Sequence, residues 1–241
     1  YEGVCDFIIE NEIELAIWEF LDGKWNWEGC FARDYSMDVD ELPLPNWNGF
    51  PVERYSYAPA LPRRRFLPIQ SSRGCSYGCT FCPYMVVQGT RMKFRSPESI
   101  EEEVRQLSTR WGVRSILFRD ILFGVGRKRT EEICERIKSL NLDLEWGCEM
   151  RIDSLSEGLI DKMVSAGMRV INLGIETPND KILNESGKKG VEESKIRFII
   201  GKLHDLGVRV QAFYMLGLWQ DTADSMKETI SFSKKLNSFS A

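Results

Sequence analysis

The sequence has 241 residues, a formal net charge of −4, 43% hydrophobic residues and 28% charged residues. This composition is typical of a globular protein and excludes disordered, collagen-like and low-complexity chains. The longest apolar runs fall far short of the roughly 20 residues that span a membrane. No secretory signal segment opens the chain, so we expect no transmembrane segment and a cytoplasmic location.

Seven cysteines occur with a single histidine. An odd number of cysteines without a signal segment argues against a disulfide framework and favours metal or redox chemistry in a reducing compartment. Charge is uneven, because residues 1–50 hold 12 acidic and 2 basic side chains whereas the remainder is mildly basic. That small positive excess does not indicate nucleic acid, so we expect no nucleic acid partner.

The first 22 residues predict one strand and one helix. Cys5–Ile9 is a short β-rich apolar run, and apolar residues follow at helical spacing over Glu12–Leu21. A single βα unit cannot enclose a core, so we expect residues 1–22 to be the end of a larger α/β domain, and the start at Tyr1 agrees with that expectation. Five prolines favour an irregular connector over residues 23–66.

From residue 67 onward, strands and helices alternate. The β-rich runs are at residues 67–73, 113–119, 144–149, 169–175 and 208–216. Helical patterns follow at residues 97–111, 129–140, 156–166, 191–206 and 222–236. This alternation predicts βαβ units and a parallel sheet, which binds its ligands at the carboxyl ends of the strands. The residues that follow each strand are therefore the candidates for a functional site.

The loop after the first of these strands carries Cys75, Cys79 and Cys82 with the spacing C-x3-C-x2-C. Thiolates bind soft metal centres, chiefly zinc and iron–sulfur clusters. Gly74 and Gly78 would let the backbone wrap closely around such a centre. A structural zinc site usually takes four protein ligands, and this loop has no fourth cysteine. A cluster with one open iron is therefore favoured over zinc.

The three cysteines, with the aromatic Phe81 before the last one, resemble the CxxxCxΦC signature of the radical S-adenosylmethionine (radical SAM) enzymes. The blocks KFRSPESIEEEV, RDILF, WGCEMRID, MVSAGMRVINLGIET and FYMLG resemble successive blocks of the cobalamin-dependent class of that superfamily. The resemblance implies an α/β fold in which residues 67–241 form a partial (β/α)6 TIM-like barrel that lacks its last strand. The last βα unit of a Rossmann-like cobalamin-binding domain would precede it.

The resemblance also implies a set of site residues. Cys75, Cys79 and Cys82 would bind a 4Fe-4S cluster, whose open iron takes the amino and carboxylate groups of S-adenosylmethionine and whose electron releases a 5′-deoxyadenosyl radical. Each remaining candidate also has a plainer interpretation as a core aromatic, a helix cap or a structural ion pair. These candidates are Phe81 and Tyr214 for the adenine, Asp120 for the amine, Arg151 for the carboxylate, and Glu176 for the ribose and methionyl part.

The N-terminal part departs from the cobalamin-dependent class. The segment DFIIENEIE aligns with a final strand that often reads DYVVRGEGE, but it lacks both glycines, and the cobalamin-binding D-x-H-x-x-G element is absent. We therefore expect cobalamin to be a cofactor of the full-length protein that this chain does not bind alone. The chain would then be a piece of a longer enzyme, truncated at both ends.

The resemblance predicts an enzyme that methylates an unactivated carbon or remodels a ring. Its substrate would be a small molecule, lipid, tetrapyrrole or peptide, and its electron donor a protein such as flavodoxin or ferredoxin. One alternative is a methylthiotransferase-like radical SAM enzyme acting on RNA or protein, which would carry further N-terminal cysteines and a C-terminal RNA-binding module. The other is a non-catalytic fragment that binds an iron–sulfur cluster or zinc.

Overall fold

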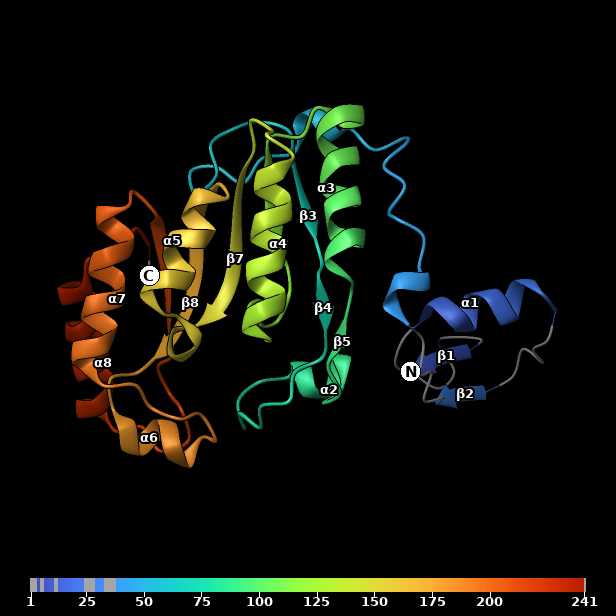
Figure 1. Cartoon of the computed structure of the whole chain (residues 1–241). Coiled ribbons are helices and arrows are strands. Elements are labelled where there is room, and N and C mark those ends of the chain that lie inside the picture. The colour runs from blue at the N-terminus through green and yellow to red at the C-terminus, as the bar shows by residue number, and fades with distance from the viewer. Residues whose placement is uncertain (1–3, 5–6, 11–12, 24–28, 33–37, 241) are drawn as a thin grey trace.

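The structure is a computed structural model that describes residues 4, 7–10, 13–23, 29–32 and 38–240. Its main body is an open, curved, five-stranded sheet (Figure 1). All neighbouring strands are parallel, and their order in space follows the chain. This confirms the predicted α/β fold with a parallel sheet. The strands, in order, are β3 (Phe66–Ile69), β6 (Ser115–Phe118), β7 (Glu145–Arg151), β8 (Met168–Glu176) and β9 (Arg209–Tyr214).

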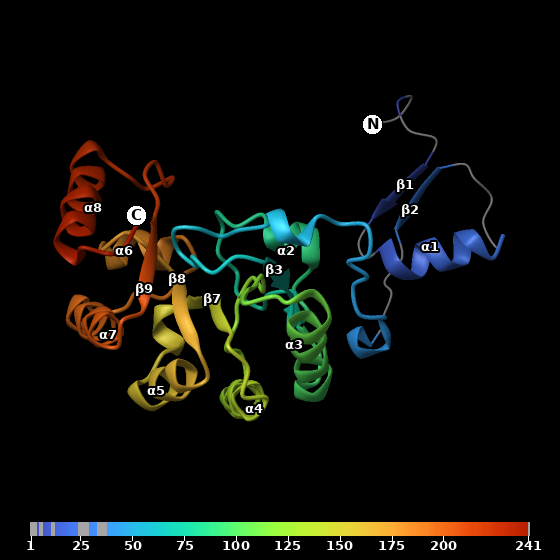
Figure 2. The same cartoon turned by 90° about the horizontal axis from the view of Figure 1, so that it is seen from above.

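Five helices form a layer on the outer side of this sheet, where they follow one another around its curve (Figure 2). Each begins and ends within two residues of the predicted range. The carboxyl ends of the strands therefore all lie at one edge, because every crossover returns the chain to the opposite edge. The helices are α3 (Pro97–Trp111), α4 (Arg127–Ser139), α5 (Glu157–Ser165), α7 (Glu193–Asp205) and α8 (Ala223–Leu236).

Local sequence signals account for these helix ends. The hydroxyl of Ser96 accepts from the N–H of Ser99 at the start of α3, where Pro97 takes the first helical position. The same helix ends at Gly112, whose φ of +63° lies in the left-handed region that glycine adopts without strain. At α8, Thr222 and Ser225 form a reciprocal capping box.

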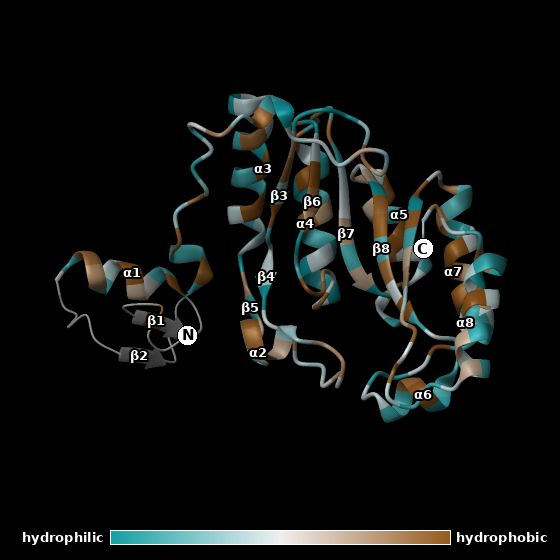
Figure 3. Ribbon diagram, turned by 180° about the vertical axis from the view of Figure 1, so that it is seen from behind, coloured by the Kyte–Doolittle hydropathy of each residue, from teal (hydrophilic) through white to brown (hydrophobic). Residues whose placement is uncertain are grey.

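The core lies between the sheet and the outer helices, and the apolar residues of both layers are concentrated there (Figure 3). All four residues of β6 are buried, as expected for a parallel strand covered on both faces. The rings of Phe118, Phe123 and Trp146 pack together, with centroids 4.6 to 5.8 Å apart. Burying each of these side chains contributes roughly 1.5–3 kcal/mol, so this aromatic group is a major source of the body's stability.

The strand predicted over residues 67–73 divides into β3 and the short β4 (Ser72–Arg73). The division occurs because the N–H of Ser71 donates to the carboxylate of Asp120 (2.7 Å) instead of to a neighbouring strand. β4 pairs antiparallel with β5 (Lys93–Phe94), and between them lies α2 (Tyr84–Gln88). These short elements, with α6 (Asp180–Glu185), surround the carboxyl edge of the sheet (Figure 1).

The N-terminal part forms a βαβ unit of β1 (Phe7–Glu10), α1 (Ile13–Leu21) and β2 (Gly29–Ala32), in which both strands are parallel. The predicted strand and helix are both present, although Cys5, Asp6, Asn11 and Glu12 lie outside the described residues. β2 corrects the expectation of an entirely irregular connector over residues 23–66. No turn residues in the sequence mark the ends of this four-residue strand. It is recognised as a strand by its pairing with β1.

The remaining connector contains two single turns, η1 (Val39–Glu41) and η2 (Val52–Arg54). Its later part contacts the amino-terminal halves of β8 and β9. Leu61 packs on Val170, and the hydroxyl of Tyr57 donates to Gln211 (3.2 Å). This contact lies at the edge of the sheet opposite to the cysteines.

Ser240 forms a parallel bridge with Gln211 on the outer edge of β9, where the predicted sixth strand would lie.

None of the helices in the described part of the chain combines the length and apolarity that a membrane-spanning segment needs.

Candidate functional site

The cysteine loop, which we define as residues 74–83, begins directly after β4. Gly74 has a φ of +81°, and a Cβ at this position would stand 2.2 Å from the carbonyl oxygen of Arg91. Glycine is therefore required where the loop turns away from the sheet.

All three cysteines of this loop line one cavity of about 180 Å³ at the carboxyl edge of the sheet. Cys75 is buried, Cys79 and Cys82 are half-buried, and all three are free thiols. Of the five other predicted site residues, the same cavity brings together Phe81, Arg151 and Glu176, whereas Asp120 and Tyr214 do not line it.

The donor set is compatible with an iron–sulfur cluster. Within the described residues, no three His, Cys, Asp or Glu side chains already surround a point that would hold a single metal ion. No histidine or fourth cysteine among these residues lines the cavity. Three thiols without a fourth soft ligand suit a cluster that keeps one iron open, and they do not complete a structural zinc site.

Two cations act on the thiol of Cys79. Burial raises the pKa of Cys79, while the positive charges of Arg151 and Lys188 oppose this rise. The guanidinium of Arg151 lies 4.1 Å from the ring centre of Tyr77 and makes two hydrogen bonds of 2.9 Å to Asp153. Positive charge held in this way favours thiolate and would favour an anionic cluster.

Glu176 and Lys188 form a buried ion pair at the rim of the cavity. The Nζ of Lys188 donates to Oε1 of Glu176 and to the carbonyl oxygen of Gly174, both at 2.7 Å. Glu176 has a φ of +67°, which is uncommon for a residue with a side chain. Strained backbone of this kind costs about 1–3 kcal/mol and is concentrated at functional sites.

The segment that carries Lys188 also holds the cysteine loop. The N–H of Thr80 donates to the carbonyl of Ser186 (3.0 Å). A Cβ on Gly187, which has a φ of +72°, would stand 2.5 Å from the carbonyl oxygen of Gly78. We call these contacts between residues 186–188 and the cysteine loop the clamp. Lys188 could not be predicted as a site residue, because nothing in the local sequence indicates its partner Glu176, twelve residues earlier.

Asp120 holds the segment that leads into the cysteine loop. Its carboxylate is fully buried and accepts from the N–H of Ser71 (2.7 Å), the hydroxyl of Ser71 (2.5 Å) and the hydroxyl of Ser72 (2.6 Å). Arg129 donates to the carbonyl oxygens of Ser71 and Arg95 nearby. In this geometry both oxygens of Asp120 bind the chain itself, so its predicted contact with the cofactor amine stays a prediction.

Tyr214, at the end of β9, packs against the core, and burial raises the pKa of its hydroxyl to about 12. The preceding residue, Phe213, lines the thiol cavity instead. Phe81 lines this cavity beside Cys82, as its position in the loop leads one to expect.

A second cavity of about 480 Å³ adjoins the first. The two share Tyr84, Ile121 and Glu149, and the second is walled by the connector at residues 42–45. Its polar residues are largely paired within the chain, since Arg95 bonds Glu103 and Arg119 bonds Glu149. The two cavities together form a cleft that leads from the connector to the thiols.

Comparison with known proteins agrees with this geometry. The sequence profile of the radical SAM superfamily matches residues 69–232. An uncharacterized methyltransferase of Pyrococcus horikoshii is 29% identical over 205 residues, which cover 85% of this chain and 44% of that protein. The anaerobic magnesium-protoporphyrin IX monomethyl ester cyclase of Rubrivivax gelatinosus is 27% identical over 202 residues, covering 83% of this chain and 36% of the cyclase.

Solved structures share the fold. The radical SAM methyltransferase TsrM of Kitasatospora setae, with cobalamin and a 4Fe-4S cluster bound, superposes with a TM-score of 0.66 at 18% identity. That superposition covers 78% of this chain and 36% of TsrM. The cobalamin-dependent enzyme OxsB gives 0.56 at 20% identity, covering 69% of this chain and 26% of OxsB. The chain thus spans less than half the length of these relatives.

Proposed function

Because this chain belongs to the radical SAM superfamily, we propose that Cys75, Cys79 and Cys82 hold a 4Fe-4S cluster and that S-adenosylmethionine binds beside it. Membership makes the chain part of an enzyme, and members of the superfamily use these two cofactors. A bound cluster supplies the electron that splits a C–S bond of S-adenosylmethionine and so yields a 5′-deoxyadenosyl radical. The observation that carries the proposal is the cavity shared by the three thiols, Arg151, Glu176 and Lys188.

The residues of the chain would divide the work of binding. Arg151 and Lys188 supply positive charge beside the thiols, which suits both the cluster and the cofactor carboxylate. Glu176 can accept from the ribose or ammonium groups while Lys188 fixes its position. Phe81 offers an apolar face for the adenine, and Asp120 positions the loop that carries the cysteines.

We further propose that the full-length protein transfers a methyl group to an unactivated carbon or remodels a ring, and that it uses cobalamin. The names of the matching relatives, which include methyltransferases and a cyclase, support this reaction class. TsrM and OxsB, which contain cobalamin, support the second cofactor. A UV–visible spectrum of the purified full-length protein after incubation with cobalamin tests this part.

A reducing partner completes the proposal. We propose a flavodoxin or ferredoxin as the electron donor and the cytoplasm as the location. Cys134 and Cys148 are free thiols, as are the three cysteines of the loop, which supports a reducing compartment. The cleft from the connector to the thiols supports a small-molecule or peptide substrate that enters beside the cofactor.

Anaerobic reconstitution tests the central claim. The chain is incubated with iron and sulfide, and then with S-adenosylmethionine and dithionite, and 5′-deoxyadenosine is measured by chromatography. We expect a 4Fe-4S absorption and EPR spectrum and product formation, both abolished in Cys75→Ala. Cys134→Ala, which alters a thiol buried in α4, should retain both signals. A loaded cluster that forms no 5′-deoxyadenosine would contradict the proposed function.

A further inference from the structure

Tyr77 lies in the cysteine loop between Cys75 and Cys79, and the proposed function gives it no role. The residue is 39% exposed and lines the thiol cavity. Its ring centre lies 4.1 Å from the guanidinium carbon of Arg151, which ends β7. The negative face of an aromatic ring attracts a guanidinium, so this contact holds the two side chains together.

Arg151 is held on two sides. Along one edge of the guanidinium, Nε and Nη2 donate to the two carboxylate oxygens of Asp153, both at 2.9 Å. Tyr77 covers one face of the same group. The third nitrogen, Nη1, makes no hydrogen bond with any described residue, although Arg151 lines the thiol cavity. Nη1 therefore remains for a ligand, in an orientation that is set before the ligand arrives.

The two supports of Arg151 belong to different parts of the chain. Asp153 lies in the single turn η3 (Ile152–Ser154), which directly follows β7, so it fixes Arg151 only relative to its own strand. Tyr77 belongs to the loop that carries the cysteines. In the described part of the chain, no hydrogen bond or ion pair joins the side chain of Arg151 to that loop. The position of Arg151 relative to the thiols therefore depends on the ring of Tyr77.

We propose that Tyr77 is a positioning residue, which holds Arg151 where this arginine binds the carboxylate of S-adenosylmethionine. The inference rests on the proposed function, because it concerns the same cofactor in the same cavity. An amino acid group that lies beside the cluster and also meets Arg151 must reach two elements at once. Tyr77 sets the distance between these two elements. The face of the ring makes the contact, so the hydroxyl of Tyr77 is dispensable.

The affinity of the reconstituted chain for S-adenosylmethionine, measured by equilibrium dialysis, tests this role. We expect Tyr77→Leu to weaken binding about fivefold, as the loss of a half-buried cation–π contact predicts. Tyr77→Phe keeps the ring and should bind as the wild type does. At saturating S-adenosylmethionine, both variants should form 5′-deoxyadenosine at the wild-type rate, because Tyr77 does not touch the reacting atoms. Weaker binding by Tyr77→Phe would assign the effect to the hydroxyl and overturn the proposal.

A double-mutant cycle with Arg151→Met shows whether Tyr77 acts through the arginine. Two residues that act as one unit have non-additive effects. Tyr77→Leu should therefore cause no further loss of affinity in a chain that already carries Arg151→Met. A full second loss in that background would mean that Tyr77 affects the cofactor independently of Arg151, which overturns the proposal.

NMR of the ligand-free chain reads the contact without a cluster. The Nε–Hε signal of Arg151 should be displaced by the ring current of Tyr77, should keep its position in Tyr77→Phe and should move in Tyr77→Leu. An unchanged signal in Tyr77→Leu would contradict the contact. Phe239→Leu is the matched control, because Phe239 is 44% exposed and its ring lies 5.9 Å from Arg209 at the opposite edge of the sheet. It should change neither the Arg151 signal nor the affinity.

The remaining outcomes separate this inference from the proposed function. Loss of the cluster in Tyr77→Leu but not in Phe239→Leu would make Tyr77 a structural part of the loop and overturn its positioning role. A wild-type chain that holds a cluster but neither binds nor cleaves S-adenosylmethionine would refute the proposed function and this inference with it. Failure of the inference alone leaves binding and cleavage by the wild type intact.

Discussion

At the scale of single residues, the site is built from charges that the chain pairs internally. Arg151 binds Asp153, Glu176 binds Lys188, and the carboxylate of Asp120 is enclosed by two serines. The sequence could predict Arg151, Glu176 and Asp120 as polar residues after strands. It could not predict their partners, because each partner follows from how the ends of the strands and the loops pack.

The ion pair of Glu176 and Lys188 gives the first prediction. Glu176→Gln keeps the shape of the side chain but leaves Lys188 as a buried cation without a counter-charge. We expect the free energy of unfolding to fall by about 3 kcal/mol, measured by urea denaturation. The double variant Glu176→Gln/Lys188→Met removes both charges and should recover most of the loss. No recovery in the double variant would show that the pair does not account for the effect.

Asp120 gives a prediction about pH. Burial raises its pKa above the usual 3.8, although hydrogen bonds from Ser71 and Ser72 oppose the rise. A raised pKa in the folded state means that the stabilising contribution is complete below the unfolded pKa and is lost as the pH rises through the folded pKa. Asp120→Asn removes this titration. The stability advantage of the wild type over Asp120→Asn should therefore be largest at acid pH and shrink toward neutrality.

Urea denaturation at several pH values between the usual aspartate pKa and neutrality measures this trend. Asp224→Asn, at an exposed position of α8, is the control and should show no comparable change with pH. A wild-type advantage that grows with pH would mean that folding lowers the pKa of Asp120.

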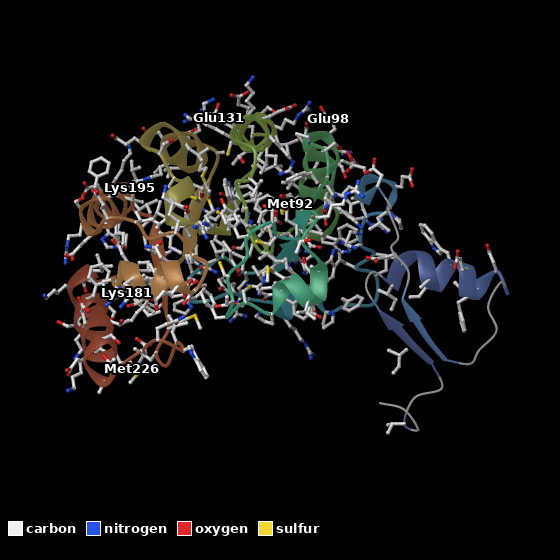
Figure 4. All side chains as sticks on the ribbon, turned by 90° about the horizontal axis from the view of Figure 1, so that it is seen from below. Met92, Glu98, Glu131, Lys181, Lys195 and Met226 are labelled. Atoms are coloured by element: carbon white, nitrogen blue, oxygen red, sulfur yellow. The ribbon has the colours of Figure 1, made fainter. Side chains whose placement is uncertain are left out.

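At the scale of elements, the outer helices are connected by a repeated ion-pair pattern. One cation on a helix binds two acidic residues of the preceding helix, and Glu98 and Glu131 belong to this pattern on the outer surface (Figure 4). Exposed pairs of this kind contribute little and are screened by salt, so the buried aromatic core matters more for stability. The pairs are Arg136 with Glu98 and Glu101, Lys162 with Glu131 and Glu135, and Lys202 with Glu157 and Asp161.

The success of the sequence predictions also varied by element. α3 was predicted to the residue because Ser96, Pro97 and Gly112 mark its ends. α6 was missed because its six residues, DKILNE, are too few for a helical repeat to stand out. β2 was missed for the same reason of length. Long elements with a clear hydrophobic repeat could be predicted from the local sequence. Short elements are defined by the segments against which they pack or pair.

The clamp gives a prediction at this scale. Gly187→Ala would push a methyl group into the carbonyl of Gly78 and would strain a left-handed residue. We expect a loss of about 1–3 kcal/mol in unfolding free energy. Displacement of the cysteine loop should also lower the iron and sulfide content after reconstitution.

Gly201→Ala is the matched control, because Gly201 lies inside α7 with open space around it. Alanine should stabilise that helix by roughly 0.5–1 kcal/mol and leave the cluster content unchanged. Equal cluster loading of Gly187→Ala and Gly201→Ala would show that the clamp does not position the cysteine loop.

At the scale of the whole molecule, the order of the parallel strands could be predicted from the alternation of elements, and the position of the site followed from it. The cleft formed by the two cavities could not be predicted, because its thiol end depends on Gly174 and on Lys188 of the clamp and its other end on the connector at residues 42–45. These contacts join segments that lie far apart in the sequence, so no local sequence pattern predicts them.

The clamp also sets an order of events during synthesis of the chain. Thr80 and Ser186 are 106 residues apart, and a ribosome needs roughly 5 to 20 s to add that length at 5–20 residues per second. During this interval the nascent chain carries Cys75, Cys79 and Cys82 without the segment that later covers them. Uncovered thiols are open to oxidation and to capture of the wrong metal. Iron and sulfide delivered after residues 186–188 have left the ribosome and packed on the loop would therefore meet a loop that is already held in place.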